Sequence, residues 1–160
     1  MEARESRAET VLVVEDDLHL LDGIRDILEL DGYTVLTAQN GAEALAVLRG
    51  RAESPHLIVS DIMMPLMDGV EFFKMVRQET RWLNVPFMFL TAKSDRQEYY
   101  DGLRLGVDDY IIKPYDPPDL LAKIESKIIR QGSIDRAQTE AMANLKRQIM
   151  TILNHEFRTP

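Results

Sequence analysis

Residues 11–17 read VLVVEDD, a short apolar run that is followed at once by three acidic residues. A continuous aliphatic run of this kind, rich in β-branched residues, is typical of a strand that is buried on both faces of a sheet. The carboxylates of Glu15, Asp16 and Asp17 would then stand at the carboxyl end of this strand. Because open parallel sheets bind their ligands at that end, the stretch also indicates where polar chemistry should be sought.

The same alternation of apolar runs and helical periodicity continues to residue 130. Apolar residues recur at helical spacing from Leu20 to Leu28, and Gly32 ends that helix before the next extended stretch. The expected strands cover residues 11–14, 33–38, 57–60, 87–90 and 110–112. The later expected helices cover residues 42–48, 70–77, 96–105 and 119–130. This order predicts an α/β fold, with one doubly wound, five-stranded parallel sheet that helices cover on both faces.

The composition is that of a folded protein and disfavours several functions. Of the 160 residues, 45% are hydrophobic and 29% are charged, with a formal net charge of −8. This negative charge argues against binding to nucleic acid or to an anionic membrane. The chain has no cysteine, which excludes disulfides and thiolate zinc sites and fits a reducing, cytoplasmic location. We expect no membrane segment, because no apolar run reaches ~18 residues and the charged first ten residues do not resemble a signal peptide.

The charge is divided unevenly along the chain, which suggests two parts. Residues 133–160 contain three acidic and four basic residues, so they carry +1 and residues 1–132 carry −9. The composition changes around Gly132. We therefore expect a flexible N-terminus over residues 1–8, a compact acidic domain over residues 9–131 and a segment of a different kind over residues 132–160.

The C-terminal segment is predicted to form one long helix, because residues 133–159 contain neither glycine nor proline. Its residues Met142, Leu145, Ile149 and Ile152 follow a spacing of three, four and three, which is typical of a coiled coil or a helical bundle. A polar helix with one narrow apolar seam needs a partner. The simplest partner is the same helix of a second copy, which gives a homodimer through residues 133–160. The alternative is that this helix packs back on its own domain.

Polar side chains follow four of the expected strands at the same edge of the sheet. Glu15 and Asp16 follow the first strand and Asp61 the third, so three carboxylates should converge. Carboxylates this close together need a cation, and hard oxygen ligands suit Mg²⁺ or Mn²⁺. Thr91 and Lys113 would add a hydroxyl and an ammonium group, and such a site suits phosphoryl transfer onto a carboxylate. For any single acid, the alternative is that it caps the following helix.

Four segments together resemble the signature sequences of response-regulator receiver domains over residues 9–131. They are VLVVEDD, IVSDIMMPLMDG, FLTAKS and DDYIIKPY, in the family's order and at its separations. The resemblance implies a flavodoxin-like strand order 2-1-3-4-5 and a phosphoacceptor at Asp61. The donor would be a phosphohistidine-bearing kinase or phosphotransfer protein. The metal ligands would be Glu15, Asp16, Asp61 and the backbone carbonyl of Met63.

The same resemblance implies roles for residues of the last two expected strands. Lys113 would contact the acyl phosphate and precede a cis peptide bond to Pro114. Thr91 and Tyr110 would form a switch pair, in which the threonine hydroxyl moves toward the new phosphoryl oxygens and Tyr110 fills the space that it leaves. Without the resemblance, Tyr110 would be read as an ordinary core aromatic.

The C-terminal residues 155–160, HEFRTP, resemble the H-box of histidine kinases, which lies on a dimerisation helix. By this resemblance His155 would be a second phosphoacceptor, and Glu156 would assist its proton transfer. Asn154 and Phe157 depart from the usual H-box, which has serine and leucine at these positions. The chain is then an N-terminal fragment of a histidine kinase in which a receiver precedes the dimerisation helix. The alternative is a stand-alone response regulator or binding module whose C-terminal helix only dimerises or docks a partner.

Overall fold

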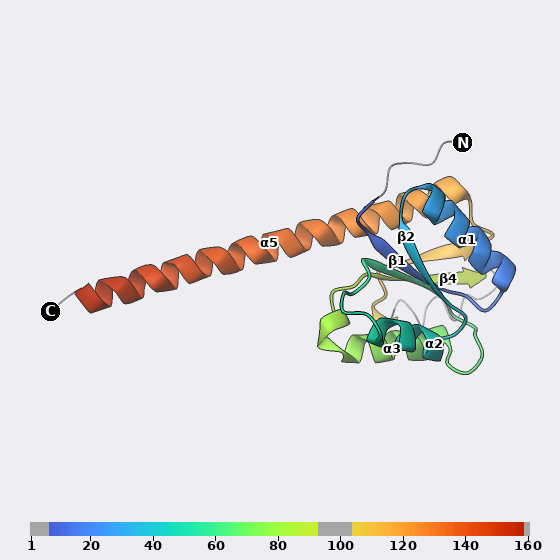
Figure 1. Cartoon of the computed structure of the whole chain (residues 1–160), viewed down its shortest axis with the longest axis horizontal. Helices are drawn as coiled ribbons and strands as arrows, with labels where there is room; N and C mark the ends of the chain where they lie inside the picture. The colour runs from blue at the N-terminus through green and yellow to red at the C-terminus, as the bar shows by residue number, and fades with distance from the viewer. Residues whose placement is uncertain (1–6, 93–103, 159–160) are drawn as a thin grey trace. The chain divides into compact units, whose positions relative to one another are not determined.

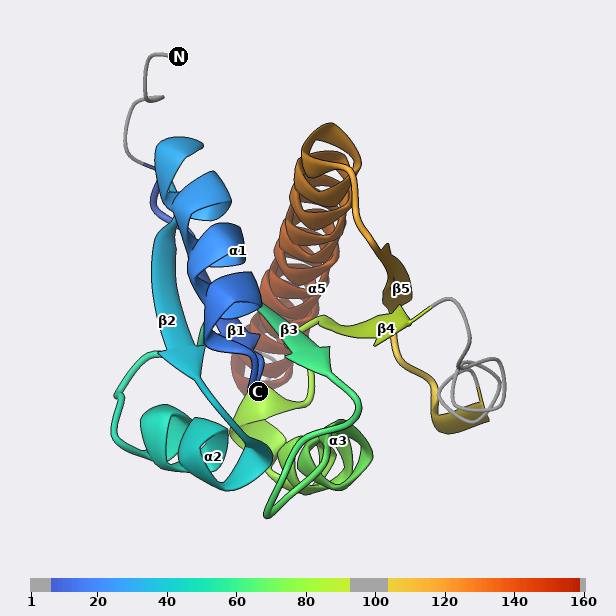
Figure 2. The same ribbon diagram turned by 90° about the vertical axis from the view of Figure 1, so that its right-hand side faces the viewer.

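A five-stranded parallel sheet forms the centre of the computed structural model, which describes residues 7–92 and 104–158. The strand order is β2-β1-β3-β4-β5, as predicted, so β1 and β3 lie side by side in the middle (Figure 2). All four strand pairs are parallel. The strands are β1 (Thr10–Val14), β2 (Thr34–Ala38), β3 (Leu57–Asp61), β4 (Phe87–Ala92) and β5 (Asp109–Lys113).

Four α-helices and one 3-10 turn are described in addition to the strands (Figure 1). They are α1 (Leu18–Leu30), α2 (Gly41–Arg49), α3 (Gly69–Gln78), η1 (Thr80–Trp82) and α5 (Pro117–Arg158). Side chains cap the first three helices, since Asp17, Asn40 and Asp68 each accept a hydrogen bond from the backbone of the first turn. Pro117 and Pro118 begin α5, where the missing amide hydrogen of proline costs nothing.

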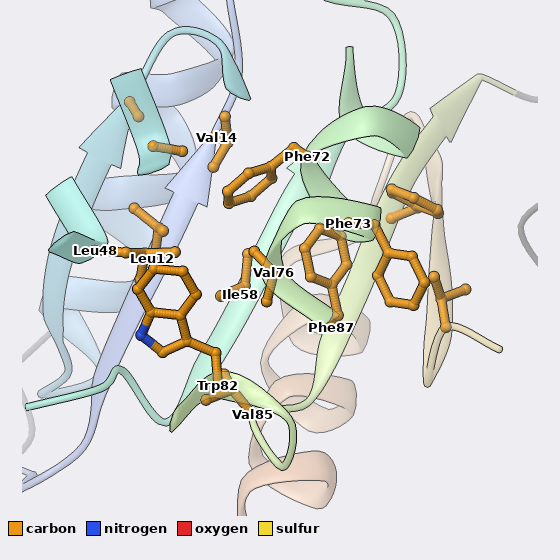
Figure 3. Close-up of a cluster of buried hydrophobic side chains, with 14 of the residues drawn as sticks. Leu12, Val14, Leu48, Ile58, Phe72, Phe73, Val76, Trp82, Val85 and Phe87 are labelled. Atoms are coloured by element: carbon orange, nitrogen blue, oxygen red, sulfur yellow. The ribbon is translucent and has the colours of Figure 1, made fainter. Parts of the chain in front are cut away.

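Two apolar cores lie on the two faces of the sheet, which explains the continuous apolar run of β1. Leu12 and Val14 face the core under α2 and α3, whereas Val11 and Val13 face the core under α1 and the first turns of α5. The first core is rich in aromatic side chains (Figure 3). Its rings contact one another at centroid distances of 5.0 to 6.1 Å, in the pairs Phe72–Phe87, Phe73–Phe87, Phe73–Phe89, Phe87–Phe89 and Phe89–Tyr110.

Helix α5 is longer than the sequence predicts. The expected helices over 119–130 and 133–160 form one helix, Pro117–Arg158, that runs through Gly132 without a break. A glycine inside a helix costs only about 1 kcal/mol, which the flanking helix formers outweigh. The chain divides into two compact units at Ile128 and Ile129, within this helix and three residues before the expected boundary at 131.

Two further expectations concern the N-terminus and the region after β4. Residues 1–6 of the expected flexible N-terminus lie outside the described residues. Arg7, which was expected to be flexible, is held, because its backbone donates to Gly32 and its guanidinium pairs with Asp31 and lies over the Tyr33 ring. Most of the expected helix over 96–105 also lies outside the described residues, as do Lys93 and Ser94 of the FLTAKS segment.

The second unit, residues 129–160, exposes its apolar seam. Met142, Leu145, Ile149 and Ile152 are all exposed in the single chain. Among the described helices, α5 included, none is both long and apolar enough to cross a membrane.

Candidate functional site

The acidic side chains meet where β1 and β3 end. Glu15 comes directly after β1, and Asp61 is the last residue of the neighbouring strand β3. The register pairs Val14 with Ser60, which places the residues that follow them at the same edge. Carboxylate oxygens of Glu15, Asp16 and Asp61 all lie within 4.8 Å of one another. The convergence expected from the sequence is therefore present.

Lys113 adds a positive charge to this cluster from the edge strand β5. It is the last residue of β5, and its side chain reaches past the intervening strand β4. Its Nζ lies 2.7 Å from Glu15 Oε1 and 3.3 Å from Asp61 Oδ2. One ammonium group thus bridges two carboxylates, and an ammonium so placed can also face an anion bound at Asp61.

Burial and crowding change the protonation of this cluster. Burial and the neighbouring Asp61 carboxyl group raise the pKa of Glu15 from 4.5 to about 8, although Lys113 acts in the opposite direction. Burial alone would lower the pKa of Lys113, but its hydrogen bond to Glu15 and the charge of Asp61 raise it overall. Without a cation, Glu15 therefore keeps its proton near neutral pH, which limits the negative charge of the cluster.

The residues present fit a hard divalent cation. Glu15 is fully buried, and its Oε2 has no hydrogen-bond partner among the described residues. A buried carboxylate oxygen without a partner is costly, and a cation beside it would remove that cost. Asp16 is exposed, so the cluster is open to solvent on one side. Three carboxylates are the ligand type that Mg²⁺ and Mn²⁺ prefer.

Asp17, the third acid after β1, caps a helix and does not belong to the cluster. Asp17 Oδ1 accepts hydrogen bonds from the backbone amides of His19 and Leu20, at 3.0 and 3.3 Å, and so caps α1. Helix capping, the alternative for any single acid, thus holds for Asp17 but not for Glu15, which pairs with Lys113. The cap also fixes where α1 begins, directly after the two acids of the cluster.

Gly69 and Tyr115 lie close to the cluster but were not expected from the sequence. A Cβ at Gly69 would stand 2.1 Å from the carbonyl oxygen of Asp61, so only glycine lets α3 start against the end of β3. Tyr115, two residues after Lys113, has a raised pKa, because of burial and then of the charge of Glu15. The MDG turn at the end of the second signature segment was the available signal for Gly69.

Thr91 and Tyr110, which were also expected at the site, are not part of this cluster. Thr91 follows Leu90, the register partner of Asp61, and its hydroxyl donates to the carbonyl of Ala92 at 3.3 Å. Tyr110 is buried, with its ring 5.9 Å from that of Phe89. The Lys113–Pro114 peptide bond is cis.

Tyr110 is also bound through its backbone, on the strand at the edge of the sheet. Its amide donates to Asp109 Oδ1 at 2.8 Å. Its carbonyl accepts a hydrogen bond from Lys123 Nζ of α5 at 2.9 Å. Helix α5 therefore holds the strand that carries Tyr110 and Lys113.

The H-box residues belong to the second unit. His155 and Glu156 are exposed near the end of α5, whereas Thr159 and Pro160 of that motif lie outside the described residues. The acidic cluster belongs to the first compact unit, whereas these residues belong to the second.

A doubly wound sheet with carboxylates and a lysine at the carboxyl ends of its strands is an arrangement that suits a cation and a phosphoryl group. The family model described as the response regulator receiver domain matches residues 11–125, and the chain belongs to this family. The family serves two-component signalling, in which an aspartate accepts the phosphoryl group from a histidine kinase or phosphotransfer protein. Its members bind Mg²⁺ through acidic residues such as those clustered here.

Similar proteins include several named as transcriptional regulators. The probable transcriptional regulator ycf27 of Pyropia yezoensis is 39% identical over 130 residues, which cover 81% of this chain and 51% of that protein. The alkaline phosphatase synthesis transcriptional regulatory protein PhoP of Bacillus subtilis is 38% identical over 130 residues, 81% of this chain and 52% of that protein. The chain thus spans about half the length of these curated relatives.

Similar solved structures include receivers from different contexts. A putative response regulator from Chloroflexus aurantiacus has a TM-score of 0.72 and 29% identity, covering 77% of this chain and 99% of that one. The signal receiver domain of a signal transduction histidine kinase from Syntrophus aciditrophicus has a TM-score of 0.70 and 31% identity, covering 76% and 90%.

Proposed function

We propose that Asp61 is the phosphoacceptor of this receiver and that Glu15, Asp16, Asp61 and the Met63 carbonyl hold Mg²⁺ or Mn²⁺ during transfer. The observation that carries the proposal is the convergence of three carboxylates with Lys113, including a buried Glu15 oxygen that has no partner. When bound, the ion supplies positive charge for the phosphoryl oxygens. Lys113 stands 3.3 Å from Asp61 and supplies a second positive charge at the same place.

In the proposed reaction an oxygen of Asp61 attacks the phosphorus of a phosphohistidine. The new P–O bond forms as the P–N bond breaks, and the released imidazole keeps the electron pair of that bond and takes up a proton. The Ile62 amide donates to Asp61 Oδ1 at 2.8 Å and so orients the carboxylate for attack. Lys113 stabilises the charge on the transferred group.

Phosphorylation of Asp61 would change the conformation of Thr91 and then of Tyr110. The Thr91 hydroxyl is bound only weakly, to the Ala92 carbonyl at 3.3 Å, so turning toward phosphoryl oxygens costs little. Thr91 and Phe89 share one face of β4, and Phe89 contacts the Tyr110 ring. A shift of Thr91 would open space on the face that Tyr110 borders.

Labelling with acetyl phosphate tests the phosphoacceptor. We expect Mg²⁺-dependent labelling that Asp61→Asn abolishes. The matched control is Asp17→Asn, because Asn caps a helix about as well as Asp and Asp17 is outside the cluster. Labelling that survives in Asp61→Asn would rule out the assignment.

We further propose that residues 132–160 form the dimerisation helix of a histidine kinase, with His155 as its phosphoacceptor and Glu156 assisting its proton transfer. The H-box resemblance and the exposed apolar seam support this, as does the likeness to a receiver from a histidine kinase. Two copies would associate through residues 133–160. A histidine-kinase catalytic core added in trans should phosphorylate the chain, and His155→Ala should abolish that labelling. Equal labelling of both chains would refute the H-box assignment.

The names of the curated relatives favour a second candidate, the receiver of a transcriptional regulator. The C-terminal helix would then only mediate dimerisation or docking. With a net charge of −8, contact with DNA would have to be made outside residues 1–160. In either case we propose a cytoplasmic protein. The His155→Ala experiment separates the two candidates, since only the first requires His155.

A further inference from the structure

We propose that two copies of α5 pair in parallel only from Met142 onward, and that Asp135 keeps the preceding stretch, residues 131–138, apart. The partner is a second copy of this chain. This inference rests on the dimer of the proposed function and narrows its contact to residues 142–153. All the residues concerned lie in the second compact unit, on the face of the helix that its heptad pattern defines.

The apolar seam occupies two heptads of α5. Met142 and Ile149 take position a of the heptad, and Leu145 and Ile152 take position d. These four side chains are 47 to 61% exposed in the single chain. An isoleucine at position a beside a leucine at position d favours a two-stranded, parallel coiled coil. In that arrangement each of the four side chains faces its own copy, which gives four apolar layers.

The preceding heptad places polar side chains on the same face of the helix. Counting back by seven residues puts Asp135 at position a, and Gln131 and Gln138 at position d. Asp135 is exposed, and its Oδ1 accepts a hydrogen bond from Gln131 Nε2 at 3.0 Å within the helix. In the single chain this carboxylate is therefore both hydrated and hydrogen-bonded. Pairing of the helices at this level would remove its water.

Parallel pairing would bring the two Asp135 carboxylates face to face. Residues at position a stand opposite their own copies, so two like charges would share one layer of the interior. The flanking positions g and e hold Ile134 and Thr139, neither of which can neutralise them. The neighbouring Arg136 lies at the outer position b and donates to Ser133 Oγ at 3.4 Å. No charge at these positions offsets the repulsion, and the helices therefore separate before this layer.

Antiparallel pairing is the other possible orientation. It would also give four apolar layers, with Met142 against the partner's Ile152 at each end. In antiparallel pairs, however, position e faces position e, so the Lys146 ammonium groups of the two copies would meet near the middle of the seam. In the parallel dimer Lys146 instead faces Ala141, which stands at position g. The parallel orientation therefore avoids a like-charge pair within the apolar seam.

The unpaired stretch lies in the sequence between the receiver and the paired seam. It contains Gly132, which has no side chain that could pack against a second helix. Because a single charge pair opposes pairing of residues 131–138, an event that offsets this charge would extend the coiled coil toward the receiver. The length of the paired region is thus the property of the dimer that is open to regulation.

Disulfide cross-linking of the full chain maps the paired region, because the chain has no native cysteine. Ile152→Cys and Gln138→Cys place a thiol at the same heptad position, within the apolar seam and within the polar stretch respectively. A disulfide forms only where the two Cβ atoms approach closely, so Gln138→Cys should cross-link about tenfold more slowly than Ile152→Cys. Adding Asp135→Asn, which keeps the shape and removes the charge, should bring the rate of Gln138→Cys to within about threefold of Ile152→Cys.

Sedimentation equilibrium gives an independent readout. Asp135→Asn should lower the dissociation constant of the dimer about fivefold, because it removes the like-charge pair that limits the length of the coiled coil. The matched control is Glu140→Gln, which removes one negative charge at the exposed outer position f. This control should leave the dissociation constant within about twofold, since position f does not face the partner.

Three results would overturn the proposal. Gln138→Cys and Ile152→Cys could cross-link at equal rates, or Asp135→Asn could change neither the cross-linking rate nor the dissociation constant. If Ile152→Cys cross-links with Met142→Cys in a mixture but not with itself, the helices are antiparallel and the proposal is wrong.

The same measurements keep this inference distinct from the proposed function. A chain that stays monomeric at every concentration would refute the proposed dimer together with this inference. A dimer that cross-links equally at residues 138 and 152 would refute this inference alone. Labelling of Asp61 by acetyl phosphate does not depend on either result.

Discussion

Helix α5 carries apolar residues at helical spacing in both compact units, but with opposite results. In the first unit Leu120, Ile124 and Ile128 are buried against the sheet. In the second unit Leu145 and Ile149 are exposed. The helix and the type of residue are the same in both units. The first unit holds the surface that its part of the helix needs, whereas the apolar residues of the second unit are exposed, which is the physical basis for proposing a second copy.

One substitution made in both units is the strongest test of this contrast. Ile124→Ala should lower the free energy of unfolding by about 2 to 5 kcal/mol, because it leaves a cavity in a core. Ile149→Ala should change it by less than about 0.5 kcal/mol in dilute solution, where its side chain is exposed. Urea unfolding at low protein concentration measures both. Similar effects would show that the seam is buried within one chain.

The pH dependence of stability is a second difference between the two units, because the buried titratable group Glu15 belongs to the first unit. Without divalent ions the folded Glu15 keeps a proton up to about pH 8, whereas the unfolded chain releases it near pH 4.5. The free energy of unfolding should therefore fall as pH rises through this window, by at most about 4 kcal/mol.

A substitution and an added ion test whether Glu15 causes this dependence of the free energy of unfolding on pH. Glu15→Gln should flatten it, since Gln does not titrate. Excess Mg²⁺ should reduce it, because the ion favours the carboxylate form. Denaturant unfolding at pH 5 and pH 8 measures each. A slope that persists in Glu15→Gln would assign the titration to another group.

Two glycines in helices give the smallest and most direct comparison. Gly69→Ala should destabilise by about 1 to 3 kcal/mol, since its Cβ would strike the Asp61 carbonyl oxygen. It should also slow labelling by acetyl phosphate, because the phosphoacceptor would have to shift. Gly132→Ala should stabilise by about 0.5 to 1 kcal/mol, as its Cβ meets only Arg136 Nη1 at 3.9 Å. Calorimetry measures the change in stability for each variant. Changes of the same sign in both variants would contradict these predictions.

The strands could be predicted because each depends on residues that are close in sequence, and the acidic cluster because each of its acids lies at the end of such a strand. An apolar run such as VLVV is typical of a strand that is buried on both faces, and acids placed just after neighbouring parallel strands lie at one edge of the sheet. The sequence alone could not show that Glu15 belongs to the cluster and that Asp17 caps α1, since both are acids that precede a helix. Their difference comes from Lys113, which is 98 positions further along the chain from Glu15.

The continuity of α5 through Gly132 and the shape of the β3–α3 loop could not be predicted either. Gly132 resembles a helix end in sequence, but the helix formers on both sides outweigh it. The positive φ of Leu66 follows from closure of the loop on Gly69 and from anchoring of Met67 at Gly41, both of which are tertiary contacts. No local pattern assigns a left-handed conformation to leucine.

The bond from Lys123 to Tyr110 has a consequence for solubility. Strand β5 is at the edge of the sheet, where an unpaired backbone can accept a strand from another molecule and start aggregation. Both polar backbone groups of Tyr110 are already bonded, the amide to Asp109 and the carbonyl to Lys123. Helix α5 thus closes a point of β-sheet extension on the receiver, and a chain shortened before Lys123 would leave that edge open to aggregation.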